Sequence, residues 1–340
     1  MNDLGSIPRS HHSSDGTPQP TFRLVADAAG ISEAARLLSA GAVVAFPTET
    51  VYGLGADASD PAAVARIFTA KARPRFNPLI AHLPDPEAAL REGVFDTAAR
   101  QLAAAFWPGP LTLVVPVRRT GTVCDLARAG LDSVALRVPG NALARELLAR
   151  VGRPVAAPSA NRSGRVSPTS AAHVLADLDG RIAAVLDGGS APVGVESTVV
   201  ACLGGVPRLL RPGGTTRADL VRVLGIDLPG PADDAAHAPV GPGLLASHYA
   251  PRAQVRLGAT EVREGEAVLL FGGALTGDDA ALASLDLSQA GDLGEAAANL
   301  FAFLRHLDAT GAAIIAVAPI PESGLGEAIN DRLRRAAAPR

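Results

Sequence analysis

The sequence has few of the residues on which several classes of protein depend. Its 340 residues include only two cysteines, Cys124 and Cys202, which have neither a disulfide framework nor Cys-x-x-Cys spacing. We expect both to be small core residues in a protein of the reducing cytoplasm. Aromatic residues make up 4% of the chain, which disfavours stacking on single-stranded nucleic acid as its main activity.

Long apolar runs and an excess of positive charge are missing as well. No apolar run reaches the roughly 18 residues that a membrane helix requires, and the N-terminus lacks the apolar region of a signal peptide. A net charge of −3 and a pI near 6.2 argue against a strongly electrostatic nucleic-acid binder. The chain has no P-loop, no Gly-x-Gly-x-x-Gly after its first strand, no Gly-x-Ser-x-Gly and no zinc-spaced cluster.

Lysine is nearly absent, since Lys71 is the only lysine among 31 basic residues. It follows a helix predicted over residues 61–70, and it opens a Lys-x-Arg-Pro-x-x-Asn-Pro loop between apolar segments. Polar loops of this kind are common positions for functional sites. A cation at the end of a helix also suits the helix dipole, so a structural role for Lys71 stays open.

Strands alternate with helices along most of the chain, which predicts an α/β fold with helices outside partly parallel sheets. The patterns predict strands at 42–46, 79–83, 111–117, 133–138, 154–157, 183–187, 197–203, 207–211, 253–257, 267–271 and 312–318. They predict helices at 31–40, 61–70, 85–105, 141–150, 170–178, 216–224, 294–308 and 326–337. We therefore expect a disordered tail (1–20), a first domain (21–224), a Pro- and Gly-rich linker (225–251) and a small α/β domain (252–340).

Both tyrosines lie in loops that resemble binding motifs. Tyr52 belongs to the loop over residues 47–55, where a role in binding and simple packing on the core are equally open. Tyr249 stands beside a histidine in Ser247-His-Tyr-Ala-Pro251, inside the predicted linker. Such a pair in an otherwise featureless linker indicates contact with a pocket or a ligand.

Three arginines, Arg73, Arg137 and Arg211, occur at strand ends or in loops, where guanidinium groups bind carboxylates or phosphates. Arg137 interrupts a buried strand and must meet an anion, either a structural carboxylate or a ligand. Six other arginines are expected on solvated helix faces: Arg128, Arg150, Arg222, Arg332, Arg334 and Arg335.

A loop of small hydrogen-bonding residues follows the strand at 154–157. Ser159, Asn161, Ser163 and Ser167 can cradle phosphate oxygens, but taken alone they are better explained by a capped turn before the helix at 170–178. His82 is a single histidine on a strand, where packing is commoner than catalysis.

Together these stretches resemble the threonylcarbamoyl-AMP synthase family, the YrdC-like enzymes. The resemblance rests on Pro47–Gly55, Lys71-Ala-Arg-Pro with Asn77-Pro-Leu, Ser133–Pro139, Ala157–Asn161, Glu196-Ser-Thr-Val199 and Arg211-Pro-Gly213. It continues through Ser247–Pro251 and Gly324–Arg335, which are similar to the long form with a small C-terminal domain. The resemblance implies a YrdC-like twisted mixed sheet flanked by helices, followed by a Rossmann-like α/β domain, with the linker over the active site.

The resemblance implies that L-threonine, bicarbonate and ATP are joined into threonylcarbamoyl-AMP, with release of pyrophosphate. It assigns threonine to Thr50, His82, Arg137, Ala157 and Ser197. It assigns the nucleotide to Lys71, Arg73, Asn77, Ser133, Ser159, Asn161, Ser167, Arg211 and Tyr249. Lys71, Arg73, Ser159 and Asn161 are the expected catalytic residues, acting by orientation and charge stabilisation. No general base stands out beyond His82.

The resemblance also implies partners. Mg²⁺ is expected on the triphosphate, without protein side chains as ligands. A separate tRNA threonylcarbamoyl transferase is expected to take the product, with at most a weak contact to tRNA. The main alternative is an RNA- or nucleotide-binding module without turnover. A relative of the hydrogenase-maturation proteins is a weaker alternative, because those chains carry zinc fingers and this one lacks the cysteines.

Overall fold

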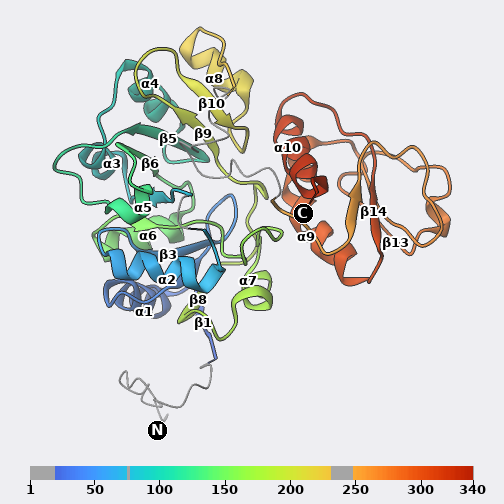
Figure 1. Cartoon of the computed structure of the whole chain (residues 1–340), viewed down its shortest axis with the longest axis horizontal. Helices are drawn as coiled ribbons and strands as arrows, with labels where there is room; N and C mark the ends of the chain where they lie inside the picture. Colours follow the sequence, from blue (N-terminus) through green and yellow to red (C-terminus); the bar gives the residue numbers. More distant parts are fainter. Residues whose placement is uncertain (1–19, 75–76, 231–247, 340) are drawn as a thin grey trace.

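The computed structural model describes residues 20–74, 77–230 and 248–339, which form two α/β parts, each with its own sheet (Figure 1). The predicted fold class is confirmed, since the first sheet is large and mixed and the second is small and parallel. The tail predicted over 1–20 and most of the linker predicted over 225–251 lie outside the described residues.

The first sheet has ten strands. In sheet order they are β1 (Phe22–Val25), β8 (Ala184–Asp187), β2 (Val44–Phe46), β3 (Gly53–Asp57), β7 (Val155–Ala156), β4 (Ile80–His82), β6 (Ser133–Arg137), β5 (Leu111–Pro116), β9 (Thr198–Ala201) and β10 (Arg208–Arg211). Pairs such as β4 with β6 are parallel, whereas β5 with β6 is antiparallel. Strands far apart in the sequence are therefore neighbours at the centre of the sheet.

Eight α-helices belong to the described residues of this part. They are α1 (Ala28–Ser39), α2 (Pro61–Lys71), α3 (Pro86–Glu92), α4 (Thr97–Phe106), α5 (Asp125–Arg128), α6 (Ala142–Val151), α7 (Ala171–Leu178) and α8 (Arg217–Leu224). Most begin at a residue whose side chain accepts a backbone N–H of the first turn, as Asp27 accepts from Gly30 at 2.8 Å. These caps account for the close agreement between predicted and observed helix starts.

The two faces of the sheet are covered unequally. One face packs against α2, α3 and α4 over most of its width. On the other face, α1 and α6 cover only the half around Phe46 and Val155. The uncovered half carries Ile80 and Ala135, and because side chains alternate along a strand, His82 on β4 faces the same way as Ile80. This half of the face carries the polar residues described below.

Several elements differ from their prediction, among them β1 and the short helix α5, which were not predicted. Residues 53–55, predicted as loop, begin strand β3, whose Gly55 lies so close to Phe46 that an added Cβ would be 2.8 Å from its ring. The helix predicted over 85–105 is two helices, since Gly93 leaves the helix to bridge Val117. Strand β13 (Ala283–Asp286) was not predicted, because its side chains are only partly buried. Strands that are rich in glycine or exposed show little of the alternation of apolar and polar side chains by which a strand is predicted.

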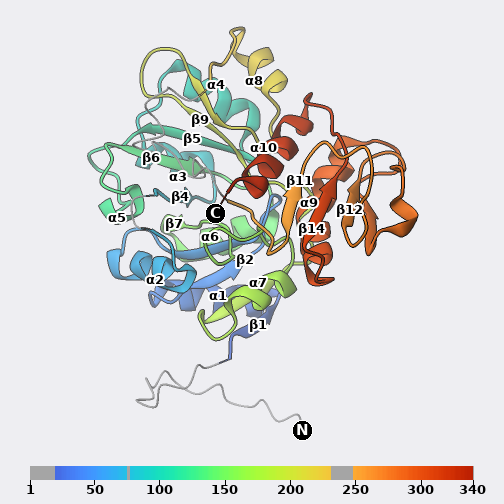
Figure 2. The same cartoon turned by 45° about the vertical axis from the view of Figure 1, so that its right-hand side comes forward.

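The small sheet is parallel, with the order β11 (Gln254–Arg256), β14 (Ile314–Val317), β12 (Ala267–Leu270) and β13. A short 3-10 helix, η2 (Asp278–Ala280), precedes β13, and α9 (Leu293–Ala309) and α10 (Leu325–Ala337) complete this part. Both long helices lie on the side of the small sheet that faces the large one (Figures 1 and 2). Over the described ranges, no helix is both long and apolar enough to cross a membrane.

The two parts are in direct contact. Arg305 on α9 donates to Asp177 on α7 at 2.8 Å, and Arg217 on α8 donates to Glu327 on α10 at 2.6 Å. Gly194 has a φ of +77°, and a Cβ there would lie 2.1 Å from the carbonyl oxygen of Ala297 on α9. Glycine is therefore required where the backbone of one part rests on a helix of the other.

Tyr52 is a structural residue, which settles the alternative left open by the sequence. It is fully buried, and its hydroxyl donates to the Gly189 carbonyl at 2.6 Å while accepting from the Gly188 N–H at 3.2 Å. The ring ties the loop after β2 to the loop after β8.

We expect Tyr52→Phe to lower the free energy of unfolding by about 1 kcal/mol, because the hydrogen bonds of the hydroxyl to Gly188 and Gly189 are then lost. Urea unfolding followed by circular dichroism measures this. Ligand affinity should stay at the wild-type value, since Tyr52 is not among the residues that line the pocket described below. Unchanged stability together with weaker ligand binding would contradict a structural role.

Candidate functional site

A pocket opens on the uncovered half of the sheet face. It is lined by Thr48, Thr50, Val51, Gly53, Arg73, Pro78, Leu79, Ile80, His82, Arg137, Ala157, Pro158, Ser159, Glu196, Ser197, Arg211, His248 and Tyr249. Nine of the predicted site residues meet there: Thr50, Arg73, His82, Arg137, Ala157, Ser159, Ser197, Arg211 and Tyr249. The other predicted residues, Lys71, Asn77, Ser133, Asn161 and Ser167, are not among the lining residues.

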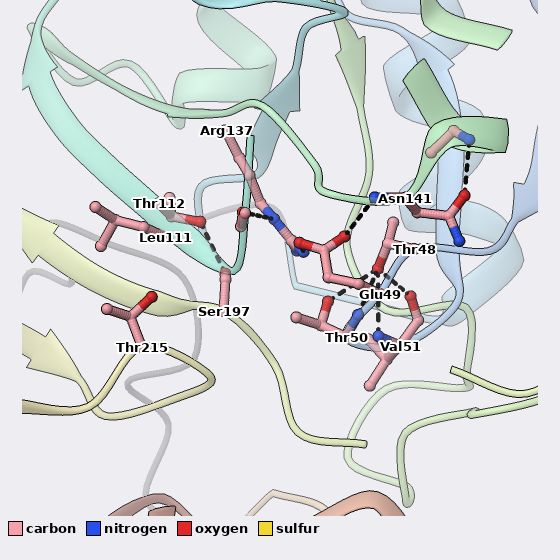
Figure 3. Close-up of polar contacts among 12 residues, drawn as sticks. Thr48, Glu49, Thr50, Val51, Leu111, Thr112, Arg137, Asn141, Ser197 and Thr215 are labelled. Carbon is pink, nitrogen blue, oxygen red and sulfur yellow. Dashed lines mark hydrogen bonds and ion pairs between the residues drawn. The ribbon is translucent and has the colours of Figure 1, made fainter. Parts of the chain in front are cut away.

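Arg137 is held at one end of this pocket by a carboxylate (Figure 3). Its Nη2 donates to Glu49 Oε1 at 2.7 Å, and Glu49 Oε2 accepts from the Asn141 N–H at 3.3 Å. Burial alone would raise the pKa of Glu49, but Arg137 and the backbone donors outweigh it and lower the pKa. The anion that Arg137 requires is thus supplied by the protein, and the guanidinium is fixed in position beside the pocket.

Thr48 shapes the loop that carries Glu49. Its Oγ1 donates to the Val51 carbonyl at 2.6 Å and lies 2.9 Å from Thr50 Oγ1 (Figure 3). The backbone N–H groups of Thr50 and Val51 donate to the same oxygen. This turn places the Thr50 side chain in the pocket wall, on the side of Arg137.

Ser197 faces Arg137 across the pocket from the segment before β9. Its Oγ lies 2.8 Å from Thr112 Oγ1 on β5, and Thr112 pairs with Arg137 across the sheet (Figure 3). Thr50, Ser197 and Arg137 therefore surround one small polar space. A carboxylate with neighbouring hydroxyl or amino groups fits such a set of donors and acceptors.

Lys71 lies at the C-terminal end of α2 with 1% exposure. Its ammonium donates to the carbonyls of Ser159 at 2.6 Å and Asn161 at 2.5 Å. Burial, followed by Arg73, places the pKa of Lys71 well below its usual value. Lys71 therefore lies at the end of a helix, as predicted. It also makes specific contacts beyond the helix dipole, because its ammonium holds the Ser159–Asn161 loop against the pocket.

Two further cations line the pocket beside this loop. Burial lowers the pKa of Arg73 to about 10, with Tyr249 acting in the opposite direction and Arg211 adding to the decrease. Arg73 Nε has no hydrogen-bond partner among the described residues. Arg211 donates to the Ser197 carbonyl at 2.8 Å, a neutral acceptor, and Glu196 acts on it as a nearby negative charge. The pair forms a positive region suited to phosphate groups.

The remaining predicted nucleotide residues lie behind the lining or apart from it. Asn77 and Asn161 are buried, and the Oδ1 atom of each lacks a hydrogen-bond partner in the described part of the chain. Ser167 donates to Glu196 Oε1 at 2.5 Å. Ser133 begins β6, at the opposite end of that strand from Arg137. An orphaned buried acceptor requires a partner, so the two asparagines are suited to donors on a ligand.

The predicted contact of the linker tyrosine with a pocket is confirmed. Tyr249 is 1% exposed, stacks on Phe301 with ring centres 5.6 Å apart, and has a φ of +60°. His248 lines the pocket with it, and its Nδ1 has no hydrogen-bond partner among the described residues. The segment after residue 247 is therefore part of the pocket wall.

Four charged residues were missed or misjudged in the sequence. Glu49 and Glu196 belong to the motifs quoted above, but the sequence did not show that each is buried beside an arginine. Arg332, expected on a solvated helix face, is fully buried and donates to Glu196 Oε2 at 2.9 Å. Arg128 is also largely covered, with a side-chain exposure of 14%, because it donates to backbone carbonyls. Helical spacing alone does not show which arginines meet another part of the molecule.

Across residues 20–74, 77–230 and 248–339, no group of three or more His, Cys, Asp and Glu side chains is placed to bind a metal ion.

Comparison with protein families covers nearly all of the described chain. The family model Sua5_yciO_yrdC, described as "Telomere recombination", matches residues 36–213. The model Sua5_C, described as the C-terminal domain of threonylcarbamoyl-AMP synthase, matches residues 215–338. The chain belongs to the Sua5/YciO/YrdC family. The presence of both matches makes it a long, Sua5-type member, as the motifs predicted.

Individual Sua5 relatives agree with this placement. The threonylcarbamoyl-AMP synthase of Bacillus subtilis is 41% identical over 321 residues, covering 90% of this chain and 92% of its own length. That of Pyrococcus abyssi is 42% identical over 328 residues, covering 89% and 92%. The crystal structure of P. abyssi Sua5 complexed with L-threonine superposes with a TM-score of 0.84 at 38% identity, covering 93% of this chain and 97% of that one.

His82 gives this Sua5-type pocket a characteristic pH dependence of stability. Burial, followed by Arg137, lowers the pKa of His82 from 6.5 to about 3. The unfolded chain therefore binds one more proton at this residue between these two values. The contribution of His82 is fully present above pH 6.5 and is lost as the pH falls towards 3.

We expect the wild type to lose stability relative to His82→Gln by about 1.4 kcal/mol per pH unit in the middle of this window. Urea unfolding of both proteins at several pH values between 6.5 and 4 measures the difference in slope. Parallel curves would show that the ring is protonated in the folded protein.

Proposed function

We propose that this chain is a threonylcarbamoyl-AMP synthase. It joins L-threonine, bicarbonate and ATP to give L-threonylcarbamoyladenylate and pyrophosphate, the first step of threonylcarbamoyladenosine modification of tRNA. The observation that carries the proposal is that one pocket combines an arginine fixed by Glu49, suited to a carboxylate, with two further arginines, Arg73 and Arg211, suited to phosphates. The name of the relatives and the bound L-threonine of P. abyssi Sua5 support the same reaction.

Threonine is proposed to bind at the Arg137 end of the pocket. The carboxylate pairs with Arg137, which Glu49 holds in place. Thr50, Ser197, His82 and the backbone at Ala157 surround the remaining groups of the amino acid. With a pKa of about 3, His82 is a weak base near neutral pH, so its role is to pack and orient.

The nucleotide is proposed to bind at the opposite end. Arg73 and Arg211 contact the phosphates, and Ser159 and Tyr249 line the same region. Lys71 acts by holding the Ser159 loop, and the free acceptors of Asn77 and Asn161 receive donors of the nucleotide. Ser133 and Ser167 are proposed to complete the site around it.

The chemistry follows from placing two substrates side by side. Threonine carbamate, formed from threonine and bicarbonate, attacks the α-phosphorus of ATP through a carboxylate oxygen. A new P–O bond forms as the bond to the β-phosphate breaks, and pyrophosphate leaves with the electron pair. Arg73 and Arg211 stabilise the charge that develops on the phosphates, so the protein contributes mainly orientation and electrostatics.

Mg²⁺ is proposed to enter as part of the nucleotide. Glu196 is the one carboxylate in the pocket lining, and both of its oxygens are already engaged by Ser167 and Arg332. These residues fit a triphosphate that carries its own metal ion, because the side chains provide the positive charge and the phosphates provide the oxygens. The ion would neutralise part of the phosphate charge during transfer.

The product is proposed to pass to a separate tRNA threonylcarbamoyl transferase. A mixed anhydride of a carbamate and a phosphate hydrolyses easily, so a partner that accepts the group directly is chemically favoured. Contact between this chain and tRNA is then not required, and any such contact is weak. The alternative, an RNA- or nucleotide-binding module without turnover, requires the same pocket to bind without releasing pyrophosphate.

Pyrophosphate release from ATP tests the proposal. We expect release in the complete mixture and none when threonine, bicarbonate or Mg²⁺ is left out. Release that does not depend on threonine would show that the second substrate is a different molecule. ATP binding without release under all conditions would favour the binding module.

The carboxylate site has its own test. Arg137→Met should raise the KM for threonine about 100-fold or more, because Glu49 is then an unpaired anion where the substrate carboxylate must bind. The KM for ATP should change little. Arg222→Met, at an exposed arginine of α8, is the matched control. Equal increases in both KM values would place Arg137 outside the threonine site.

A further inference from the structure

Arg332 connects the last helix of the small part to the pocket on the large part. It lies on α10, is 0% exposed, and donates from Nε to Glu196 Oε2 at 2.9 Å and from Nη1 to the Pro212 carbonyl at 2.7 Å. Its guanidinium carbon is 5.4 Å from the centre of the Tyr249 ring. A residue remote in sequence thus contacts two residues of the pocket wall.

Glu196 lies where its negative charge affects the proposed phosphate site. It lines the pocket together with Arg73 and Arg211, the proposed phosphate ligands. Both its oxygens are engaged, one by Ser167 at 2.5 Å and the other by Arg332. Burial opposes ionisation of this carboxyl, and Arg332, followed by Arg211, lowers its pKa so that it stays charged.

Without Arg332, the carboxylate would have other cations to pair with. Arg211 donates to the carbonyl of Ser197, the residue next to Glu196, and Arg73 Nε has no partner among the described residues. A buried carboxylate pairs with the nearest available cation, because an unpaired charge in the interior is costly. A pair with either arginine would cancel the charge that phosphate binding requires.

Stability alone explains this arrangement poorly. A buried ion pair contributes little net stability, since desolvation of both charges offsets their attraction. Arg332 Nη2 is buried and has no hydrogen-bond partner among the described residues, which adds a further cost. An apolar contact between α10 and the pocket wall would hold the two parts together without these costs. The retained charge therefore indicates a role in the pocket.

We propose that Arg332 is a positioning residue of the nucleotide site, which holds the Glu196 carboxylate away from Arg73 and Arg211. These two arginines then keep their charge for the phosphates of ATP. The inference rests on the proposed function, because it assumes that this pocket binds ATP. It assigns the small C-terminal part a direct role in nucleotide affinity.

The first test compares two interdomain arginines. Arg332→Met replaces the aliphatic part of the arginine with an unbranched apolar side chain and removes the guanidinium, and it should weaken ATP binding about tenfold or more. Arg217→Met removes the ion pair with Glu327, which also joins the two parts but lies away from the pocket lining, and should change ATP affinity less than about twofold. Isothermal titration calorimetry with ATP and Mg²⁺ measures both without turnover.

The second test removes the carboxylate itself. Glu196→Gln should bind ATP at least as tightly as the wild type, and Arg332→Met/Glu196→Gln should return to within about threefold of the wild type. A merely structural role of Arg332 predicts weaker ATP binding in Glu196→Gln as well, because that variant leaves the buried Arg332 without its carboxylate. The double variant also avoids the unpaired buried charge that destabilises the single variant.

The outcomes separate the inference from the proposed function. Wild-type affinity in Arg332→Met, no rescue in the double variant, or loss of ATP binding in Glu196→Gln would each overturn the inference. The last result would indicate that Glu196 itself binds the nucleotide or its metal ion. A wild-type protein that binds no ATP would overturn the proposed function and this inference with it.

Discussion

The need to compensate buried positive charge is the constraint on which this pocket depends. Four buried cations are each met by a specific acceptor, since an unpaired charge in the interior would cost several kcal/mol. The pairs are Arg137 with Glu49, Arg332 with Glu196, Arg211 with the Ser197 carbonyl, and Lys71 with the carbonyls of Ser159 and Asn161. These contacts therefore lower the free-energy cost of burying the cations, and they also hold the loops that supply the acceptors in position.

The kind of acceptor differs between the two ends of the pocket. At one end Glu49 neutralises Arg137, so the local charge is close to zero and suits an amino acid that carries both charges. At the other end a carbonyl oxygen accepts from Arg211, and this neutral acceptor does not cancel the charge of Arg211 as Glu49 cancels that of Arg137. A triphosphate, with several negative charges, suits that end. Charge matching therefore orients two different substrates in one space.

Local sequence predicted most of the fold, because helix caps and apolar alternation act over a few residues. It failed at β3, where Gly53 and Gly55 have no side chains to alternate, and at Gly93, which divides a helix. The motifs placed Arg137 and Tyr249 in a pocket correctly. The hydrogen-bond partners of the buried charges were not predicted, because they come from distant segments of the chain. Arg332 and Glu196 are an example, since helical spacing does not show which distant residue an arginine contacts.

The contact at Gly194 limits how the two parts can move. There the backbone of the large part meets the backbone of α9 at Ala297, with no side chain between them. Backbone atoms have no rotamers that could absorb a small displacement, so this point acts as a hard stop. At Gly194 the two parts therefore cannot approach further without displacing backbone atoms. Separating them would require breaking the ion pairs that join them, such as those of Arg305 with Asp177 and Arg332 with Glu196.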